Sequence, residues 1–176
     1  MIRPIYLYGS KVLREVAKPA DLTKKEEIKQ LVTDLKDTLA ASEGCGLAAP
    51  QIGESTRLVI VDGDVMKDVY PYLTGFRRTF VNPVILEESE EKTVYSEGCL
   101  SVPDFSETVA RPMRMVVRGK DRHGEDIEIP ADGLLARCLS HEIDHLNGIL
   151  FVDRLSPLKR SLIRNKIRKL IKAGEW

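Results

Sequence analysis

Residues 133–147, Gly-Leu-Leu-Ala-Arg-Cys-Leu-Ser-His-Glu-Ile-Asp-His-Leu-Asn, form the stretch around which this sequence is organised. Its leucine spacing predicts a buried helix that Gly148 ends. Within that helix His141 and His145 are four residues apart, so both imidazoles lie on one face and can reach the same cation. Glu142 is offset from His141 by about 100°. Its carboxylate should therefore lie beside the cation, where it can take the proton of an attacking water.

The alternative is a solvated helix that carries two histidines by chance. The chain has only three histidines, and two of them stand at this spacing with a glutamate between them, so we favour the metal site. A catalytic tetrahedral site uses three protein ligands, which leaves one more to find among cysteines and carboxylates. Cys99 follows a glycine, Cys45 stands between two glycines, and Cys138 shares a helix face with His141. Local reasoning leaves Cys99 only modestly ahead, and Cys138 is more typical of a small buried wall residue.

On either side of this helix, hydrophobic periodicity and turn residues predict the other elements. Ser10 can cap a short helix over residues 11–17, and Ile28, Leu31, Val32, Leu35 and Leu39 give residues 24–42 an apolar helical stripe. Four strands are expected at 58–61, 79–86, 113–118 and 125–129, the last two joined by a turn at 121–124. Pro83 should place the second strand at an edge or a bulge. A short strand at 149–152 and a helix opened by Ser156-Pro157 complete the chain.

This order of elements predicts an α+β fold in a single compact domain over residues 1–176, with antiparallel or mixed sheets around the central H-E-x-x-H helix. Residues 154–173 should form a basic amphipathic C-terminal helix whose apolar stripe packs on the body. Residues 154–176 hold eight of the 27 Lys and Arg and one of the 27 Asp and Glu. The preceding 153 residues therefore carry a net charge of −7, and this asymmetry needs a reason.

Composition excludes several other classes of protein. The hydrophobic fraction is 43% and the charged fraction 31%, as in ordinary globular proteins. No apolar run approaches the roughly 18–20 residues that span a bilayer. The first residues lack the pattern of a secretory signal, so we expect a cytoplasmic protein. Its three cysteines should then be thiols.

Three blocks in this order resemble the peptide deformylase family. They are Gly-Cys-Gly-Leu-Ala-Ala-Pro-Gln at 44–51, Glu-Gly-Cys-Leu-Ser at 97–101 and His-Glu-Ile-Asp-His at 141–145. The resemblance covers most of the chain and implies an enzyme that removes the formyl group from the N-terminal methionine of new polypeptides. Position 45 departs from the family, where a branched aliphatic residue is common.

The resemblance also implies roles for individual residues. It implies three metal ligands: Cys99, His141 and His145. Glu142 would act as general base and then general acid, while the Gln51 amide and the Leu100 backbone N–H would stabilise the oxyanion.

The resemblance also implies that the substrate peptide lies along two short segments, one around Gly46 and one around Gly98. Gly46 and Leu47 would offer backbone groups to an extended peptide, with Cys45 and Gly98 beside them. An apolar pocket for the methionine side chain would include Leu134 and Cys138.

Three charged residues near these segments have expected supporting roles. Glu97 and Arg111 would pair to support the Cys99 loop. Arg137 would extend toward solvent. The role of Asp144 is open between orienting an imidazole and local packing.

The implied cofactor is one divalent ion, most typically Fe²⁺, with Zn²⁺, Ni²⁺ or Co²⁺ in purified protein. The implied partners are formyl-Met nascent peptides and the ribosome, reached through the basic C-terminal helix, with no membrane and no DNA. Two alternatives stay open on the sequence: a zinc endopeptidase, and a ribosome-bound factor that is not an enzyme and whose metal is structural. A cysteine ligand and the Gln51 block argue against the first, and an acid beside an open ligand position argues against the second.

Overall fold

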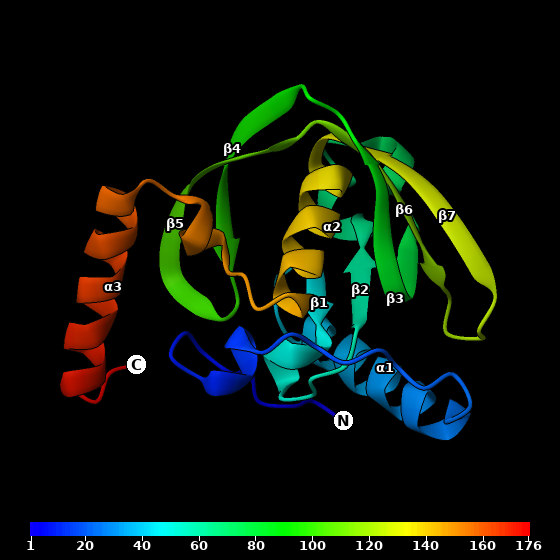
Figure 1. The fold of residues 1–176 in the computed structure, drawn as a ribbon, viewed down its shortest axis with the longest axis horizontal. Helices are drawn as coiled ribbons and strands as arrows, with labels where there is room; N and C mark the ends of the chain where they lie inside the picture. The colour runs from blue at the N-terminus through cyan, green and yellow to red at the C-terminus, as the bar shows by residue number, and fades with distance from the viewer.

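The computed structural model describes residues 1–176 and places the helix of the H-E-x-x-H motif at the centre of an α+β fold (Figure 1). This helix is α2, Gly133–Leu146, and it ends one residue before the predicted limit. One antiparallel sheet has five strands in the order β1-β2-β3-β6-β7. Their bounds are β1 (Gly46–Ala48), β2 (Leu58–Asp62), β3 (Arg77–Glu88), β6 (Arg114–Lys120) and β7 (Asp126–Asp132). The strands β4 (Lys92–Cys99) and β5 (Val102–Pro112) form a separate antiparallel hairpin.

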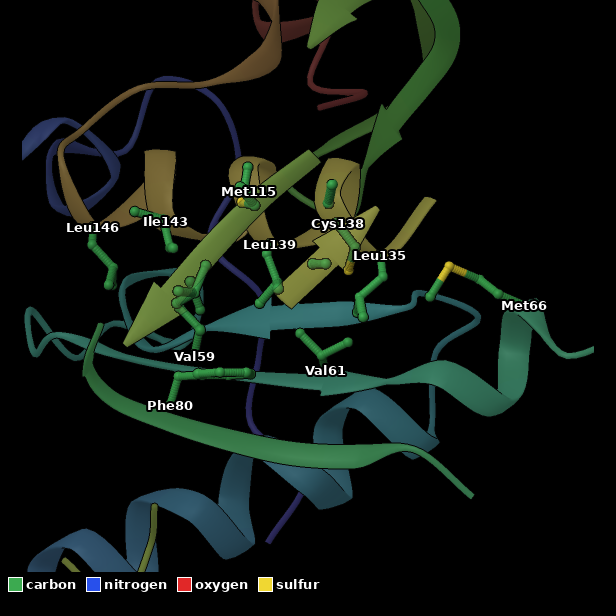
Figure 2. Close-up of a cluster of buried hydrophobic side chains, with 14 of the residues drawn as sticks. Val59, Val61, Met66, Phe80, Met115, Leu135, Cys138, Leu139, Ile143 and Leu146 are labelled. Carbon is green, nitrogen blue, oxygen red and sulfur yellow. The ribbon is translucent and has the colours of Figure 1, made fainter. Parts of the chain in front are cut away.

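The core forms where α2 packs against the five-stranded sheet (Figure 2). Leu135, Leu139, Ile143 and Leu146 of α2 are at most 5% exposed, as the periodicity predicts. Helix α1, Lys25–Ala40, covers the sheet from another side through Ile28, Val32, Leu35 and Leu39. The central helix is thereby held by apolar burial along its whole length, which fixes the direction of its histidines.

One predicted element near the N-terminus is wrong, whereas one of the two placements predicted for the Pro83 strand is confirmed. Residues 11–17 do not form an α-helix, because only a 3₁₀ turn, η1, spans Lys11–Arg14, and the Ser10 side chain caps nothing. The strand that contains Pro83 is interior to the sheet, between β2 and β6. The predicted bulge is confirmed, because the pairing register shifts between Val81 and Val84.

The segment after α2 is also different from the prediction. Residues 149–152 form no strand, and a 3₁₀ turn, η5, spans Phe151–Arg154. The apolar residues that suggested a strand, among them Leu150 and Phe151, are buried together in one cluster with side chains of β5 and the last helix. A short apolar run predicts burial but cannot distinguish a buried strand from another buried conformation.

The C-terminal helix α3, Pro157–Lys172, begins at the predicted Ser156-Pro157 signal and is shorter than the predicted range of residues 154–173. The Ser156 hydroxyl accepts a hydrogen bond from the Lys159 N–H. Its stripe docks only in part: Ile163 and Ile167 are buried, whereas Leu158, Leu162 and Ile171 are 51–70% exposed. Helix α3 lies against the hairpin side of the molecule, far from α1 (Figure 1). No helix is long and apolar enough to cross a membrane.

Candidate active site

The three predicted ligand side chains converge on one point. Cys99 ends β4, and His141 and His145 follow one another on α2; their ligand atoms all lie within 4.8 Å of one another. His145 Nε2 is 3.4 Å from Cys99 Sγ and 3.2 Å from His141 Nε2. With ordinary zinc bond lengths, tetrahedral ligands would be separated by about 3.6 Å for a sulfur–nitrogen pair and about 3.3 Å for two nitrogens. The donor set therefore fits one divalent transition-metal ion.

The protonation of Cys99 suits this role. Burial opposes ionisation of its thiol, but the neighbouring histidines, His145 first, outweigh burial and hold the pKa of Cys99 well below its usual value. The Ser101 N–H also points to the sulfur at 3.4 Å. A thiolate is the form of cysteine that binds metals.

Glu142 brings a free carboxylate oxygen to the same place. It is 3% exposed, its Oε1 lies 3.7 Å from His141 Nε2, and its Oε2 has no hydrogen-bond partner. Burial raises the pKa of this carboxyl group. A buried acceptor without a partner is costly to maintain, so its position beside the ligands indicates a task that a water or a substrate completes.

Gln51 is held in one orientation by three contacts. Its Oε1 accepts a hydrogen bond from the Ala48 N–H at 3.0 Å, so the amide Nε2 is the end that faces Ser101 Oγ, at 3.1 Å, and Cys99 Sγ, at 3.7 Å. The residue is 1% exposed, in the 3₁₀ turn η2 (Ala49–Ile52) that follows β1. The arrangement presents a fixed N–H donor to the ligand cluster.

A cavity opens beside this cluster and contains eleven of the fourteen predicted site residues in its lining. They are Cys45, Gly46, Gln51, Glu97, Gly98, Cys99, Leu100, Leu134, Cys138, His141 and Glu142. His145 and Arg111 lie behind this wall, both fully buried. Leu47 turns its side chain into the core under α1, although its strand β1 is an edge of the sheet. Met66 also lines the cavity; it lies in the 3₁₀ turn η3 (Gly63–Met66), and no motif marks it in the sequence.

A buried ionic network lies behind the three predicted ligands and contacts His141. Glu97 accepts two hydrogen bonds from Arg111, at 2.7 and 2.8 Å, and its Oε1 lies 2.9 Å from His141 Nδ1. Burial alone would raise the pKa of Glu97, but Arg111 and His141 hold that pKa far below its usual range. The predicted pair of Glu97 and Arg111 is thus present, and Glu97 also orients the His141 imidazole.

The same network corrects the expectation for Arg137 and decides the question about Asp144. Arg137 does not extend to solvent: it is 5% exposed and donates to Glu97 and to the Val109 carbonyl. Asp144 touches neither imidazole and accepts hydrogen bonds from Arg111, at 2.7 Å, and from Arg154. The positive charge of Arg137 can be buried because Glu97, which lies on β4, pairs with it. The sequence around Arg137 gives no sign of this partner.

Comparison with known proteins identifies the family. The family model for polypeptide deformylase matches residues 2–161. The chain belongs to this family. It is 46% identical over 171 residues to a peptide deformylase from Cellvibrio japonicus, covering 97% of this chain and 96% of the relative. A solved peptide deformylase from Legionella pneumophila superposes with a TM-score of 0.85 at 42% identity, over 99% of this chain and 98% of that one. Another, from Ehrlichia chaffeensis in complex with actinonin, has a TM-score of 0.84 at 35% identity and covers 96% of each chain.

Membership in the deformylase family establishes the activity. The chain is a hydrolase that removes the formyl group from the N-terminal formyl-methionine of nascent polypeptides, and it acts in protein biosynthesis. The family is metal-dependent, and the cluster of Cys99, His141 and His145 could hold the ion. The endopeptidase and the structural-metal alternatives are both excluded by the family.

Proposed function

We propose that Cys99, His141 and His145 hold a single catalytic divalent ion, Fe²⁺ in the cell, and that Glu142, Gln51 and the Leu100 N–H carry out deformylation beside it. The observation that carries this proposal is the convergence of the three ligand atoms next to the unpartnered oxygen of Glu142. The ion, when bound, would act as a Lewis acid that makes a water nucleophilic near neutral pH.

Glu142 carries out the proton transfers, and Gln51 and Leu100 stabilise the negative charge that develops on the formyl oxygen. Glu142 accepts a proton from the water that attacks the formyl carbon, and returns it to the methionine nitrogen as the C–N bond breaks. The products are formate and a free N-terminal amine. The Gln51 amide, fixed by its Ala48 contact, donates to the formyl oxygen as negative charge develops there, and the Leu100 N–H is the second donor.

The cavity suits an extended peptide that begins with methionine. Gly46 and Leu47 belong to edge strand β1, whose free side can pair with a substrate backbone, and Gly98 lies across the cavity at the end of β4. Leu134, Cys138 and Cys45 supply apolar wall for the thioether side chain.

Reconstitution with defined metals tests the proposed ion. Protein stripped of metal and loaded anaerobically with Fe²⁺, Zn²⁺, Ni²⁺ or Co²⁺ is assayed for formate release from a formyl-Met peptide. We expect the Fe²⁺ form to be highly active and to lose activity in air, because Fe²⁺ and the Cys99 thiolate are both oxidisable. An Fe²⁺ form that stays inactive under anaerobic conditions would refute the choice of ion.

Metal analysis of two cysteine variants tests the ligand set. Cys99→Ala should lose the ion, because two imidazoles alone hold a divalent cation weakly. Cys138→Ala is the matched control, since its sulfur lines the same cavity, and this variant should bind metal in equal stoichiometry with the parent. The reverse result would assign the ligand to Cys138.

We infer further that the protein works in the cytoplasm and docks on the ribosome through α3. Of the eight Lys and Arg in residues 154–176, three form ion pairs with the body: Arg154, Lys159 and Arg160. Lys166, Lys169 and Lys172 are exposed and pair with no carboxylate, so a positive surface is left for phosphate groups.

A further inference from the structure

The wall of the cavity contains a pair of thiols in contact. The sulfur atoms of Cys45 and Cys138 are 2.9 Å apart, although 93 positions separate these residues in the chain. Both are free cysteines. A disulfide bond is about 2.0 Å long, so the two sulfurs are about 0.9 Å from bonding distance.

The backbone holds this pair together from both sides. The Cys45 carbonyl accepts a hydrogen bond from the Asp62 N–H at 2.8 Å, which ties the residue to the end of β2. Cys138 lies on the buried face of α2 (Figure 2). A Cβ placed on Gly46 would be 3.0 Å from Cys138 Sγ, so strand and helix already touch beside the two sulfurs.

Access to the pair differs between its two members. Cys138 is 4% exposed, whereas Cys45 is half-buried and lines both the cavity and the adjoining hollow beside Phe105. A small solute can therefore reach Cys45 first, with Cys138 directly behind it. The hydrogen bond from the Cys138 thiol also lowers the pKa of Cys45, which favours its reaction.

We propose that Cys45 and Cys138 form a reversible disulfide under hydroperoxide, and that this bond narrows the cavity and slows deformylation. The Cys45 thiolate attacks the peroxide, so that an S–O bond forms, the O–O bond breaks and hydroxide leaves, taking up the proton that the thiol lost. Cys138 then attacks the resulting sulfenic acid: the S–S bond forms, and the S–O oxygen leaves as water with the Cys138 proton. Two thiols are oxidised to one disulfide while one hydrogen peroxide is reduced to two waters.

The effect on turnover rests on the proposed placement of the methionine side chain, but formation of the bond does not. The cavity has a volume of about 240 Å³, and Cys45 and Cys138 meet within its wall. Bonding must move at least one sulfur by about 0.9 Å within this wall, and Cys45 directly precedes Gly46, where the peptide backbone is expected to pair. Changes of about a methylene in an apolar pocket alter kcat/KM by about tenfold or more.

The experiment uses full-length protein loaded with Zn²⁺, because this ion has no redox chemistry. The protein is treated with a small excess of hydrogen peroxide, alkylated and digested without reductant. We expect a cross-linked peptide that joins Cys45 to Cys138, unchanged metal content, and a fall of about tenfold in kcat/KM. Dithiothreitol should reverse both the cross-link and the fall. Formate release by the untreated sample tests the proposed function separately.

Two variants keep the result decisive, each compared with its own untreated sample. Cys45→Val and Cys138→Ala should lose little activity under the same peroxide dose. An equal loss in Cys45→Val, accompanied by release of the ion, would assign the oxidation to Cys99 and overturn the proposal. Both thiols recovered unmodified in the parent protein would also overturn it. A cross-link without any change in kcat/KM would refute the effect on the cavity.

Discussion

Glu142 is the residue whose position is hardest to explain without catalysis, because one carboxylate oxygen is buried with no partner. Glu142→Ala should keep the fold and the metal but lower kcat by about 10²–10⁴-fold, since it removes a proton carrier and no ligand. Formate release and metal analysis measure the two properties. Glu91→Ala, at an exposed acid away from the cavity, is the control and should match the parent. An empty metal site in Glu142→Ala would contradict the assigned role.

Gln51 is a second single residue whose role a substitution can test. Gln51→Leu should leave the metal in place and lower kcat by roughly 10²–10³-fold, because one oxyanion donor is lost while the side-chain volume is kept. The other glutamine of the chain supplies the control: Gln30 donates to Asp34 on α1, and Gln30→Leu should not change kcat. If Gln51→Leu lowers kcat by less than about threefold, well below the range for such a donor, Gln51 is only part of the wall.

At the scale of elements, Arg111 of β5 joins the β4–β5 hairpin to α2. It is 1% exposed and contacts Glu97, Ser140 and Asp144. Arg111→Met should lower the free energy of unfolding by about 3–5 kcal/mol, because it leaves two buried carboxylates with fewer partners. The exposed pair of Arg114 and Glu91 is the matched control, and Arg114→Met should cost at most about 1 kcal/mol.

Urea unfolding at a fixed metal concentration measures both arginine variants, because bound metal itself adds to stability. Equal losses in Arg111→Met and Arg114→Met would show that the buried network does not hold the hairpin on α2.

At the scale of the whole molecule, the basic surface of α3 and the cavity lie on different elements. Changing Lys166, Lys169 and Lys172 together to Gln should weaken cosedimentation with ribosomes, because fewer phosphate contacts release fewer counterions. Binding of the parent should fall steeply between low and high salt. Turnover of a short free formyl-Met peptide should be unchanged in the variant.

The matched control for this experiment removes the same charge from the opposite part of the molecule. Lys25, Lys29 and Lys36 are exposed on α1, away from α3 (Figure 1). Their triple change to Gln should leave ribosome binding as in the parent. If both triple variants and the parent pellet equally with ribosomes, without salt dependence, the α3 lysines do not contribute to ribosome binding.

We infer that residues 1–176 act as one domain, because α2 contacts both the five-stranded sheet and the hairpin. The C-terminal end is anchored as well: Trp176 packs on Phe105 and its Nε1 donates to the Tyr8 carbonyl at 2.9 Å. A single thermal transition for the metal-loaded protein would support this inference.

Features that depend on local spacing follow from the order of the amino acids alone. The four-residue separation of His141 and His145 is a helical repeat, so one imidazole had to lie above the other. The stripe of α1 and the alternation at β6 and β7 are local in the same way. Local physics left the choice between Cys99 and Cys138 almost undecided. The ordered set of three motifs made that choice.

Contacts between segments that are distant in the chain are visible only in the folded structure. Arg137 is buried because Glu97 arrives from β4, and Cys45 meets Cys138 because β1 packs on α2. Strand β4 escaped prediction because both of its faces are largely exposed and leave little alternation in the sequence. Strand β5 does alternate in burial, but its covered face includes Glu107 and Arg111, so the alternation is hidden in the hydropathy pattern. Apolar residues at 149–152 indicated burial but not a backbone conformation. Periodicity reports which side of an element is covered, whereas the partner that covers it is set by long-range packing.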